Sequence, residues 1–205
     1  MSNSISDVSN SIFWDKLYDQ NNDKWDIQQP TPVFVEWESS LKLNKKNINI
    51  CFPGCGIGHD ALYFASRGYN VYAVDFSNEA ILRLKKKSTK DNISINIIKE
   101  NFFQLPLNYY NYFDFIVEYT FYCAIDPDMR KDYVKTCYNL LNHNGFLVGL
   151  LFPFNVNNNG PPFKVEKNEI EINFTNMFKI KNKKSNINSI QPRKGNELFF
   201  ELQKK

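Results

Sequence analysis

Short apolar runs alternate along the chain with segments whose apolar residues recur at helical spacing. The first run covers residues 48–52 and is followed by a helical pattern over residues 59–67, which Gly68 closes. A second run covers residues 69–76, and Ser77 is a suitable N-cap for the helix after it. Short apolar runs between turn residues indicate buried strands, whereas three- and four-residue spacing indicates an amphipathic helix. This part of the chain therefore predicts strand, turn, helix, strand, helix.

The same alternation continues through the middle of the chain. Three further strands are predicted, at residues 93–99, 114–119 and 146–152. The pair Asp126-Pro127 predicts the start of an amphipathic helix that ends near Asn142. Strands that alternate with helices imply a Rossmann-like α/β fold, a mostly parallel sheet with helices on both faces and right-handed crossovers.

The last quarter of the chain has two more strand-like segments, residues 177–181 and 197–202, joined by a polar loop. We expect them to form an antiparallel hairpin that completes a seven-stranded sheet. The 205 residues show no repeat and no break in composition. We therefore expect one domain over residues 1–205, with N-terminal helices or a lid in residues 1–45 and the Rossmann-like core in residues 46–205.

Charge and composition exclude several classes of partner. The net charge is +3, and the lysines are scattered among asparagines, so no nucleic-acid footprint is visible. No apolar stretch approaches the roughly 20 residues of a membrane span, and residues 1–10 lack the pattern of a signal peptide. Four cysteines and two histidines show no ligand spacing, so we expect neither a metal site nor disulfides. The expectation is a cytoplasmic monomer that binds neither nucleic acid nor membrane.

A glycine-rich turn, Gly54 to Gly58, directly follows the first predicted strand. Its spacing is G-x-G-x-G, and His59 stands where dinucleotide-binding enzymes carry a third glycine, which favours a ligand without a pyrophosphate. Asp75 ends the second strand, where a carboxylate accepts hydrogen bonds from ribose hydroxyls. Together the two features predict a nucleoside cofactor, although each could also simply cap the helix that follows.

Two further pairs of residues follow predicted strands. Asn101-Phe102 comes after the third strand, where the amide can bind the adenine edge and the ring can pack on the adenine face. Glu118-Tyr119 ends the fourth strand, beside the expected place of the reactive end of the cofactor. Ordinary capping of a strand end is the alternative for each pair.

Seven stretches along the chain match a known family. They are Phe13-Trp14-Asp15-Lys16-Leu17-Tyr18, Trp25-Asp26 with Gln29-Pro30-Thr31-Pro32, Pro53-Gly54-Cys55-Gly56, Val74-Asp75-Phe76-Ser77, Phe121-Tyr122-Cys123-Ala124-Ile125, Gly160-Pro161-Pro162-Phe163-Lys164-Val165 and Pro192-Arg193-Lys194-Gly195. With these motifs the sequence resembles the thiopurine S-methyltransferase superfamily, and more closely its thiol and halide methyltransferase branch. The resemblance implies methyl transfer from S-adenosyl-L-methionine to a small thiol or anion such as bisulfide, thiocyanate, a halide or a small aromatic thiol. Larger aromatic thiols of the thiopurine type are the alternative.

The resemblance also implies that the N-terminal segment covers the cofactor, with Trp14, Tyr18 and Trp25 lining it. Aromatic faces, those three and Trp37, suit a sulfonium cation, although an amphipathic helix that packs its rings on the sheet gives the same pattern. Tyr18 and Asn101 stand where the plant relatives usually carry tryptophan and aspartate. Both substitutions keep an aromatic ring or a hydrogen-bonding group, so we expect cofactor binding to persist.

The acceptor side is the part in which this chain departs most. Phe163 replaces a tyrosine whose hydroxyl, by the resemblance, lies near the nucleophile, and Tyr119 or Tyr122 could supply a hydroxyl instead. Arg193 is the candidate cation for an anionic acceptor, with an exposed basic loop as the alternative interpretation. We therefore predict Arg193, Phe163 and Tyr122 as catalytic residues, and an apolar wall formed by Phe121, Tyr122, Cys123 and Phe163.

Three other functions remain open. A nicotinamide-dependent reductase would share the first strand-turn-helix, but the third glycine and a Tyr-x-x-x-Lys pair are missing. A nucleic-acid or protein N-methyltransferase would carry Asn/Asp-Pro-Pro-Tyr/Phe after the fourth strand, where this chain has residues 118–121 with the sequence Glu-Tyr-Thr-Phe. A degenerate module that holds the cofactor without turnover is the third, and Phe163 is its only hint.

Overall fold

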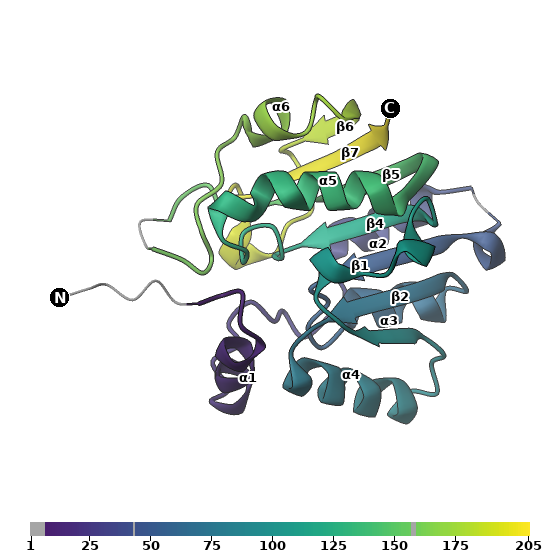
Figure 1. Ribbon diagram of the computed structural model, residues 1–205, viewed down its shortest axis with the longest axis vertical. Helices are drawn as coiled ribbons and strands as arrows, with labels where there is room; N and C mark the ends of the chain where they lie inside the picture. Colours follow the sequence, from purple (N-terminus) through teal and green to yellow (C-terminus); the bar gives the residue numbers. More distant parts are fainter. Residues whose placement is uncertain (1–6, 43, 157–158) are drawn as a thin grey trace.

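The computed structural model describes residues 7–42, 44–156 and 159–205 and contains a seven-stranded sheet with the order β3-β2-β1-β4-β5-β7-β6 (Figure 1). The strands are β1 (Asn49–Pro53), β2 (Asn70–Asp75), β3 (Asn96–Lys99), β4 (Phe113–Tyr119), β5 (Leu141–Leu151), β6 (Phe178–Lys184) and β7 (Leu198–Lys204). Strands β1 to β5 pair in parallel, whereas β7 is antiparallel to both β5 and β6. The predicted fold class is confirmed, including the terminal hairpin.

Helices cover both faces of this sheet because alternate strand residues point to opposite sides. The helices are α1 (Ser11–Asp19), α2 (Pro32–Ser40), α3 (His59–Ser66), α4 (Asn78–Lys90), α5 (Arg130–Leu140) and α6 (Glu169–Asn173). On β1, Ile50 and Phe52 share one core with α2, α3 and Leu84 of α4. Cys51, between them, faces the other core, which contains α5. Figure 1 shows α5 in front of the sheet and α2 and α3 behind it.

Several predicted boundaries shift, and two of these shifts have a clear local reason. The third strand begins at Asn96 instead of residue 93, because Asn92 has a φ of 52° and the Ile93 amide donates to the Ser88 carbonyl, which ends α4 in a left-handed turn. The helix predicted from Asp126 begins as a 3₁₀ turn, η4 (Pro127–Met129), and ends at Leu140. It ends two residues early because Leu141 already pairs with β4.

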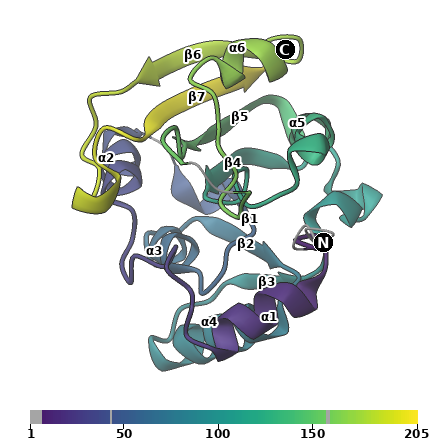
Figure 2. The same cartoon turned by 90° about the vertical axis from the view of Figure 1, so that its left-hand side faces the viewer.

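The N-terminal helix α1 lies beside α4, at the side of the sheet where β1, β2 and β4 end (Figures 1 and 2). The Asp15 carboxylate accepts hydrogen bonds from Ser77 Oγ at 2.6 Å and from the Glu79 amide at 3.1 Å. Arg83 of α4 donates from Nη2 to the Tyr18 carbonyl at 2.6 Å. These bonds fix the N-terminal segment against the start of α4.

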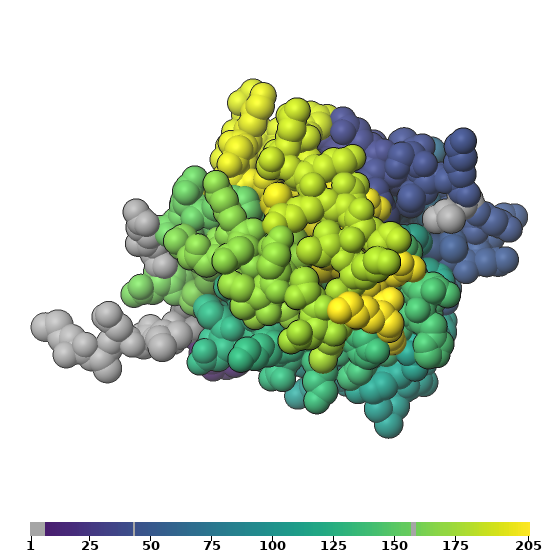
Figure 3. Space-filling model, turned by 90° about the horizontal axis from the view of Figure 1, so that it is seen from above, coloured from purple at the N-terminus to yellow at the C-terminus, as the bar shows by residue number. Residues whose placement is uncertain are grey.

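The C-terminal hairpin packs next to α2, as the space-filling view in Figure 3 shows from above. Trp37 of α2 is 7% exposed and donates from Nε1 to Glu201 of β7 at 2.9 Å. Trp37 is therefore part of the core, and for this residue the alternative interpretation, a ring that packs on the sheet, holds. No helix in the described ranges has the length and apolar character needed to cross a bilayer.

Candidate active site

A cavity of about 620 Å³ opens at the carboxyl ends of the parallel strands. Three parts of the chain enclose it. The N-terminal segment contributes Val8, Ser9, Phe13, Trp14, Leu17, Tyr18, Asn22, Lys24 and Trp25. The strand-end wall consists of Gly54, Val74, Asp75, Phe76, Glu100, Asn101, Phe102 and Phe103. The loop wall consists of Thr120, Phe121, Cys123, Ala124, Ile125, Asp126, Met129, Phe152, Pro161, Pro162, Pro192 and Arg193.

Gly54 and Asp75 form the centre of the strand-end wall. Gly54 has a φ of 54°, and a Cβ at this position would lie 2.2 Å from the Phe121 ring, so only glycine fits. Asp75 is 8% exposed, and its two carboxylate oxygens accept from the Gly56 amide at 2.8 Å and the Ser77 amide at 2.9 Å. Burial raises the pKa of Asp75 to about 6. The turn thus places the Asp75 carboxylate next to the backbone of Gly54, which no side chain shields.

Asn101 and Phe102 lie next to Asp75 on the same wall, because β3 pairs with β2. Asn101 caps the 3₁₀ turn η2 (Phe102–Gln104), and its side-chain oxygen accepts from the Phe103 amide at 3.0 Å. The Phe102 ring is 3% exposed and contacts the Phe121 ring edge to face, with centroids 5.7 Å apart. The two residues give this end of the cavity one amide group and an aromatic surface.

The three predicted aromatic residues of the N-terminal segment form one cluster over the cavity. The Trp25 ring lies 5.5 Å from Trp14 and 5.4 Å from Tyr18, edge to face in both cases. The segment is anchored beyond the cluster by Asp26, whose carboxylate lies 2.9 Å from Nε2 of His59. The structure thus brings Trp14, Tyr18 and Trp25 together, and all three line the cavity.

Arg193 lies in the loop wall and is 6% exposed. Its guanidinium carbon is 4.8 Å from the centroid of the Tyr119 ring and 4.9 Å from that of Phe152. Nη2 donates to the Trp25 carbonyl at 2.7 Å, whereas no described residue accepts a hydrogen bond from Nη1. A buried cation with a free donor is costly unless an anion pairs with it, so this position suits an anionic ligand.

Two residues predicted as catalytic do not line the cavity. Tyr122 is 2% exposed and donates to Glu169 at 2.9 Å, which places its hydroxyl in the α5–α6 core. Phe163 packs its ring on Gly160, where a Cβ would lie 2.3 Å away, so Pro161 and Pro162 face the cavity in its place. The expected wall therefore keeps Phe121 and Cys123 and lacks Tyr122 and Phe163.

Glu118 is also outside the cavity lining. It is 1% exposed and accepts from the Tyr122 amide at 2.9 Å, which ties the end of β4 to the loop after it. Burial raises the pKa of Glu118 to about 7. In the structure this carboxylate supports the loop wall through its hydrogen bond to the Tyr122 amide and does not face the cavity.

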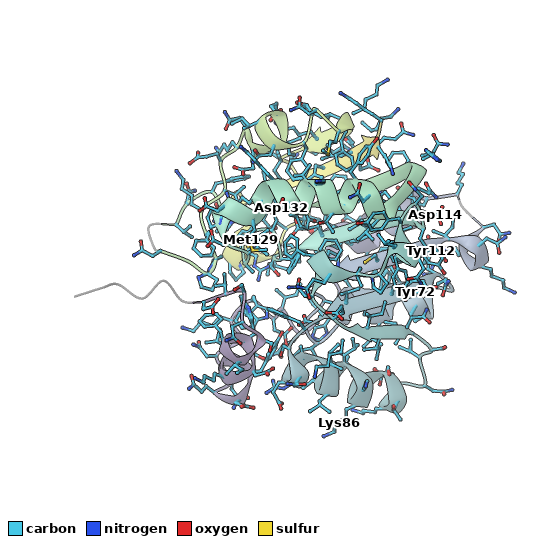
Figure 4. The ribbon with its side chains drawn as sticks, in the orientation of Figure 1. Tyr72, Lys86, Tyr112, Asp114, Met129 and Asp132 are labelled. Carbon is cyan, nitrogen blue, oxygen red and sulfur yellow. The ribbon has the colours of Figure 1, made fainter. Side chains whose placement is uncertain are left out.

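Phe152 and Asp126 are among the lining residues that sequence reasoning missed. Phe152 ended a predicted strand and Asp126 preceded a predicted helix, so the position of each residue could have indicated that it lines the cavity. The stick view in Figure 4 places Met129, on the same turn as Asp126, at the carboxyl-end side of the sheet. Tyr72, Tyr112 and Asp114 lie at the opposite edge, so their hydrogen bonds serve the fold and not the cavity.

The residues present fit S-adenosylmethionine. The cavity volume is within the range of cofactor sites, and Asp75 stands at the strand end where a ribose is bound in related folds. Aromatic rings of the N-terminal segment can face a sulfonium, and no phosphate-binding turn is present to favour a dinucleotide.

Comparisons with known proteins agree with this fit. The family model for thiopurine S-methyltransferase matches residues 9–203. Thiocyanate methyltransferase 1 of Arabidopsis thaliana is 32% identical, over 90% of this chain and 81% of the relative. Probable thiol methyltransferase 2 of the same plant is 34% identical, over 77% of this chain and 69% of the relative.

Solved structures show the same fold at low identity. The 1,6-didemethyltoxoflavin-N1-methyltransferase of Burkholderia thailandensis, with bound S-adenosylhomocysteine, has a TM-score of 0.72 at 15% identity and covers 95% of this chain and 87% of its own. Magnesium protoporphyrin IX methyltransferase of Synechocystis PCC 6803, with bound S-adenosylmethionine, has a TM-score of 0.68 at 14% identity, over 100% of this chain and 87% of its own. The chain belongs to the thiopurine S-methyltransferase family of S-adenosylmethionine-dependent methyltransferases.

Proposed function

We propose that this enzyme methylates a small anionic acceptor at sulfur or at a halide-like atom, in the manner that the names of its plant relatives suggest. The single observation that carries the proposal is Arg193, a buried guanidinium whose Nη1 has no hydrogen-bond partner among the described residues, in a loop wall made mostly of apolar side chains. Thiocyanate, bisulfide, a halide and a small aromatic thiolate all present one negative charge on a polarisable group, and each could pair with this cation.

The proposal assigns the cofactor to the N-terminal segment and the strand-end wall. Trp14, Tyr18 and Trp25 would cover it, and Asp75 would accept from its ribose hydroxyls. Of the segment predicted as lid or helices, residues 1–45, the part that lines the cavity lies within residues 8–25 and would act as a lid over the Rossmann-like core, within one domain. Glu118 and Tyr122 would act indirectly, since they hold the loop after β4 in place.

S-Adenosylmethionine supplies a methyl group on a positively charged sulfur. When the cofactor is bound, the acceptor's lone pair would form a bond to this methyl carbon while the carbon–sulfonium bond breaks, and S-adenosylhomocysteine would be the leaving group. Because the acceptor is already an anion, no proton has to be removed. The rate then depends on how the acceptor is positioned relative to the methyl group. Arg193 would hold the anion, while Phe121, Phe152 and Cys123 exclude water around it.

A larger aromatic thiol is a second candidate acceptor. The flat rings of Phe121 and Phe152 and the two prolines of the loop wall offer an apolar surface that a bare anion does not need. The thiopurine S-methyltransferases of Francisella tularensis, at 25% identity, are also similar to this chain. A module that binds the cofactor without turnover is the remaining alternative.

The test is mass spectrometry of quenched reactions that contain the full chain, S-adenosylmethionine and one acceptor. The acceptors are bisulfide, thiocyanate, iodide, thiophenol and a thiopurine. We expect S-adenosylhomocysteine and methylated product in equal amounts with at least one small anionic acceptor. Turnover of the thiopurine alone would favour the second candidate, and tight binding of S-adenosylhomocysteine without turnover of any acceptor would contradict the proposal.

A further inference from the structure

The cation of the loop wall has no carboxylate partner. Arg193 is 6% exposed, yet it forms no ion pair with any carboxylate of the described ranges, and its guanidinium donates to the Trp25 carbonyl instead. By contrast, Arg130, the other buried arginine of the described residues, pairs with Glu169 at 3.2 Å. A buried guanidinium strongly attracts a carboxylate within reach. The unpaired state of Arg193 therefore depends on how the carboxylates near it are held.

One buried carboxylate, that of Glu197, lies a single turn of chain away from Arg193. Glu197 is 3% exposed, and the Asn196 amide donates to the Arg193 carbonyl at 2.9 Å, so the chain turns between the two charged residues. Both oxygens of Glu197 accept from neutral hydroxyl groups. One accepts from Tyr119 Oη at 2.5 Å, and the other accepts from Ser189 Oγ. The carboxylate is thus satisfied without the guanidinium.

Tyr119 contacts both charges. Its hydroxyl donates to Glu197, while the guanidinium carbon of Arg193 lies 4.8 Å from the centroid of its ring. Burial raises the pKa of the Tyr119 hydroxyl, and the two charges act on that pKa in opposite directions, Arg193 downward and Glu197 upward. The ring also packs edge to face on Phe34, with centroids 6.0 Å apart. Tyr119 therefore has its hydroxyl engaged by the anion and its ring face by the cation.

We propose that Tyr119 is a positioning residue that holds the Glu197 carboxylate away from Arg193 and so keeps the guanidinium open to the anionic acceptor. The inference deepens the proposed function and rests on it, because the acceptor binds Arg193 there. Without the Tyr119 hydroxyl, one oxygen of a buried carboxylate would lose its donor. Nη1 of Arg193, which has no hydrogen-bond partner among the described residues, would then offer a replacement. The resulting ion pair would occupy the cation and compete with the acceptor.

The experiment measures the affinity of thiocyanate, and of iodide as a second anion, for the full chain saturated with S-adenosylhomocysteine. Calorimetry gives the affinity, and the methylation assay gives KM for the same anions. Tyr119→Phe keeps the ring and removes the hydroxyl. We expect both anions to bind about tenfold more weakly or worse, which corresponds to a guanidinium that is open in about one molecule in ten.

Neutralising the carboxylate should rescue that loss. The double variant Tyr119→Phe, Glu197→Gln should recover wild-type anion affinity within about threefold, because a neutral amide does not form an ion pair with the guanidinium. A hydroxyl with a purely structural role would not be rescued by removing the charge of its partner. Glu197→Gln alone keeps an oxygen that accepts from Tyr119, and it should bind both anions at least as tightly as the wild type.

Tyr69→Phe is the matched control. It also removes a buried tyrosine hydroxyl from a buried glutamate, since Tyr69 donates to Glu38 at 3.2 Å, but Tyr69 does not line the cavity and Glu38 is paired with Lys45. Its anion affinity should equal that of the wild type.

Three outcomes would overturn the inference and leave the proposed function intact. They are an unchanged anion affinity in Tyr119→Phe, a loss that persists in the double variant, and a weakened affinity in Glu197→Gln alone. The last outcome is independent of whether Tyr119→Phe folds. A wild type that binds neither anion would also overturn the inference, because Arg193 would then not be open, whereas the proposed function itself fails only when no small anionic acceptor is methylated.

Discussion

The strand-end wall and the loop wall of the cavity are built in different ways. Gly54, Asp75 and Asn101 sit where parallel strands end, and their hydrogen bonds join residues within or between neighbouring strand ends. Arg193 instead reaches the Trp25 carbonyl from the far end of the chain and is held between two rings. The first wall follows from the sheet, whereas the second depends on how distant loops pack. A change in one wall should therefore affect cofactor binding, and a change in the other should affect acceptor turnover.

The largest expected effect comes from Arg193→Met, which removes the cation of the loop wall. We expect kcat/KM for an anionic acceptor to fall about tenfold to a hundredfold, because hydrogen bonds to charged groups contribute about 1.5–3 kcal/mol. Affinity for S-adenosylhomocysteine, measured by calorimetry, should change less. Lys194→Met, at an exposed neighbouring position, is the control and should leave both values unchanged. Equal losses in both values would show that the two walls are not separable.

Asp75→Asn should lower the affinity for the cofactor product by a similar or smaller factor. We expect S-adenosylhomocysteine to bind about tenfold to a hundredfold more weakly, since the amide cannot accept from both hydroxyls and both backbone amides.

The same carboxylate should make cofactor binding depend on pH. Burial raises the pKa of Asp75 to about 6, so its acceptor form is lost as the pH falls through 6. We expect wild-type affinity for S-adenosylhomocysteine to decrease between pH 7 and pH 5, and Asp75→Asn to lack that decrease. The same slope in both proteins would assign the titration to another group.

Glu118→Gln tests the carboxylate behind the loop wall. Burial raises the pKa of Glu118 to about 7 from an ordinary value near 4.5, so the folded state binds this proton more tightly than the unfolded state does. Its contribution to the free energy of unfolding is present below the ordinary value and is lost as the pH rises to 7. Urea titrations should show wild-type stability falling between pH 5 and pH 8 more steeply than that of Glu118→Gln. Parallel slopes would refute the assignment.

The smallest effect is expected for Phe163→Tyr. The ring packs on Gly160 and does not line the cavity, so an added hydroxyl should not reach an acceptor. We expect KM and kcat to stay within about twofold of the wild type, a change of about 0.5 kcal/mol or less. A larger gain in kcat would mean that the loop wall rearranges when the acceptor binds.

This contrast also explains what the sequence could predict. The period of apolar residues identified all seven strands, and the position of a residue at a strand end identified Gly54, Asp75 and Asn101. Those features are local, or they follow from parallel strands that end at one edge. The start of β3 was predicted too early. The left-handed turn at Asn92 ends α4, and it takes up the first residues of the apolar run that was predicted as strand.

The loop wall was less predictable because its geometry depends on contacts between distant segments. The Gly-Pro-Pro-Phe motif did mark a cavity wall, but sequence cannot tell which of its side chains turns inward, and the prolines do so while Phe163 turns back. Tyr122 likewise follows a strand that ends at the cavity, yet its hydroxyl is held by Glu169 of α6, a partner 47 positions away. The sequence identified Arg193 as the candidate cation, but it did not show that the rings of Tyr119 and Phe152 flank the guanidinium.

Asp15 has a consequence for the integrity of the fold. Its carboxylate accepts from the Glu79 amide and from Ser77 Oγ, so a residue of α1 satisfies part of the exposed beginning of α4. A variant of the protein shortened before residue 20 would lose more than a cover for a ligand. It would leave the Glu79 amide and the Ser77 hydroxyl without the carboxylate that binds them, at the start of the helix that directly follows the strand of Asp75. Asp15 of the N-terminal segment thus completes the beginning of α4, a helix that starts about sixty residues later in the chain.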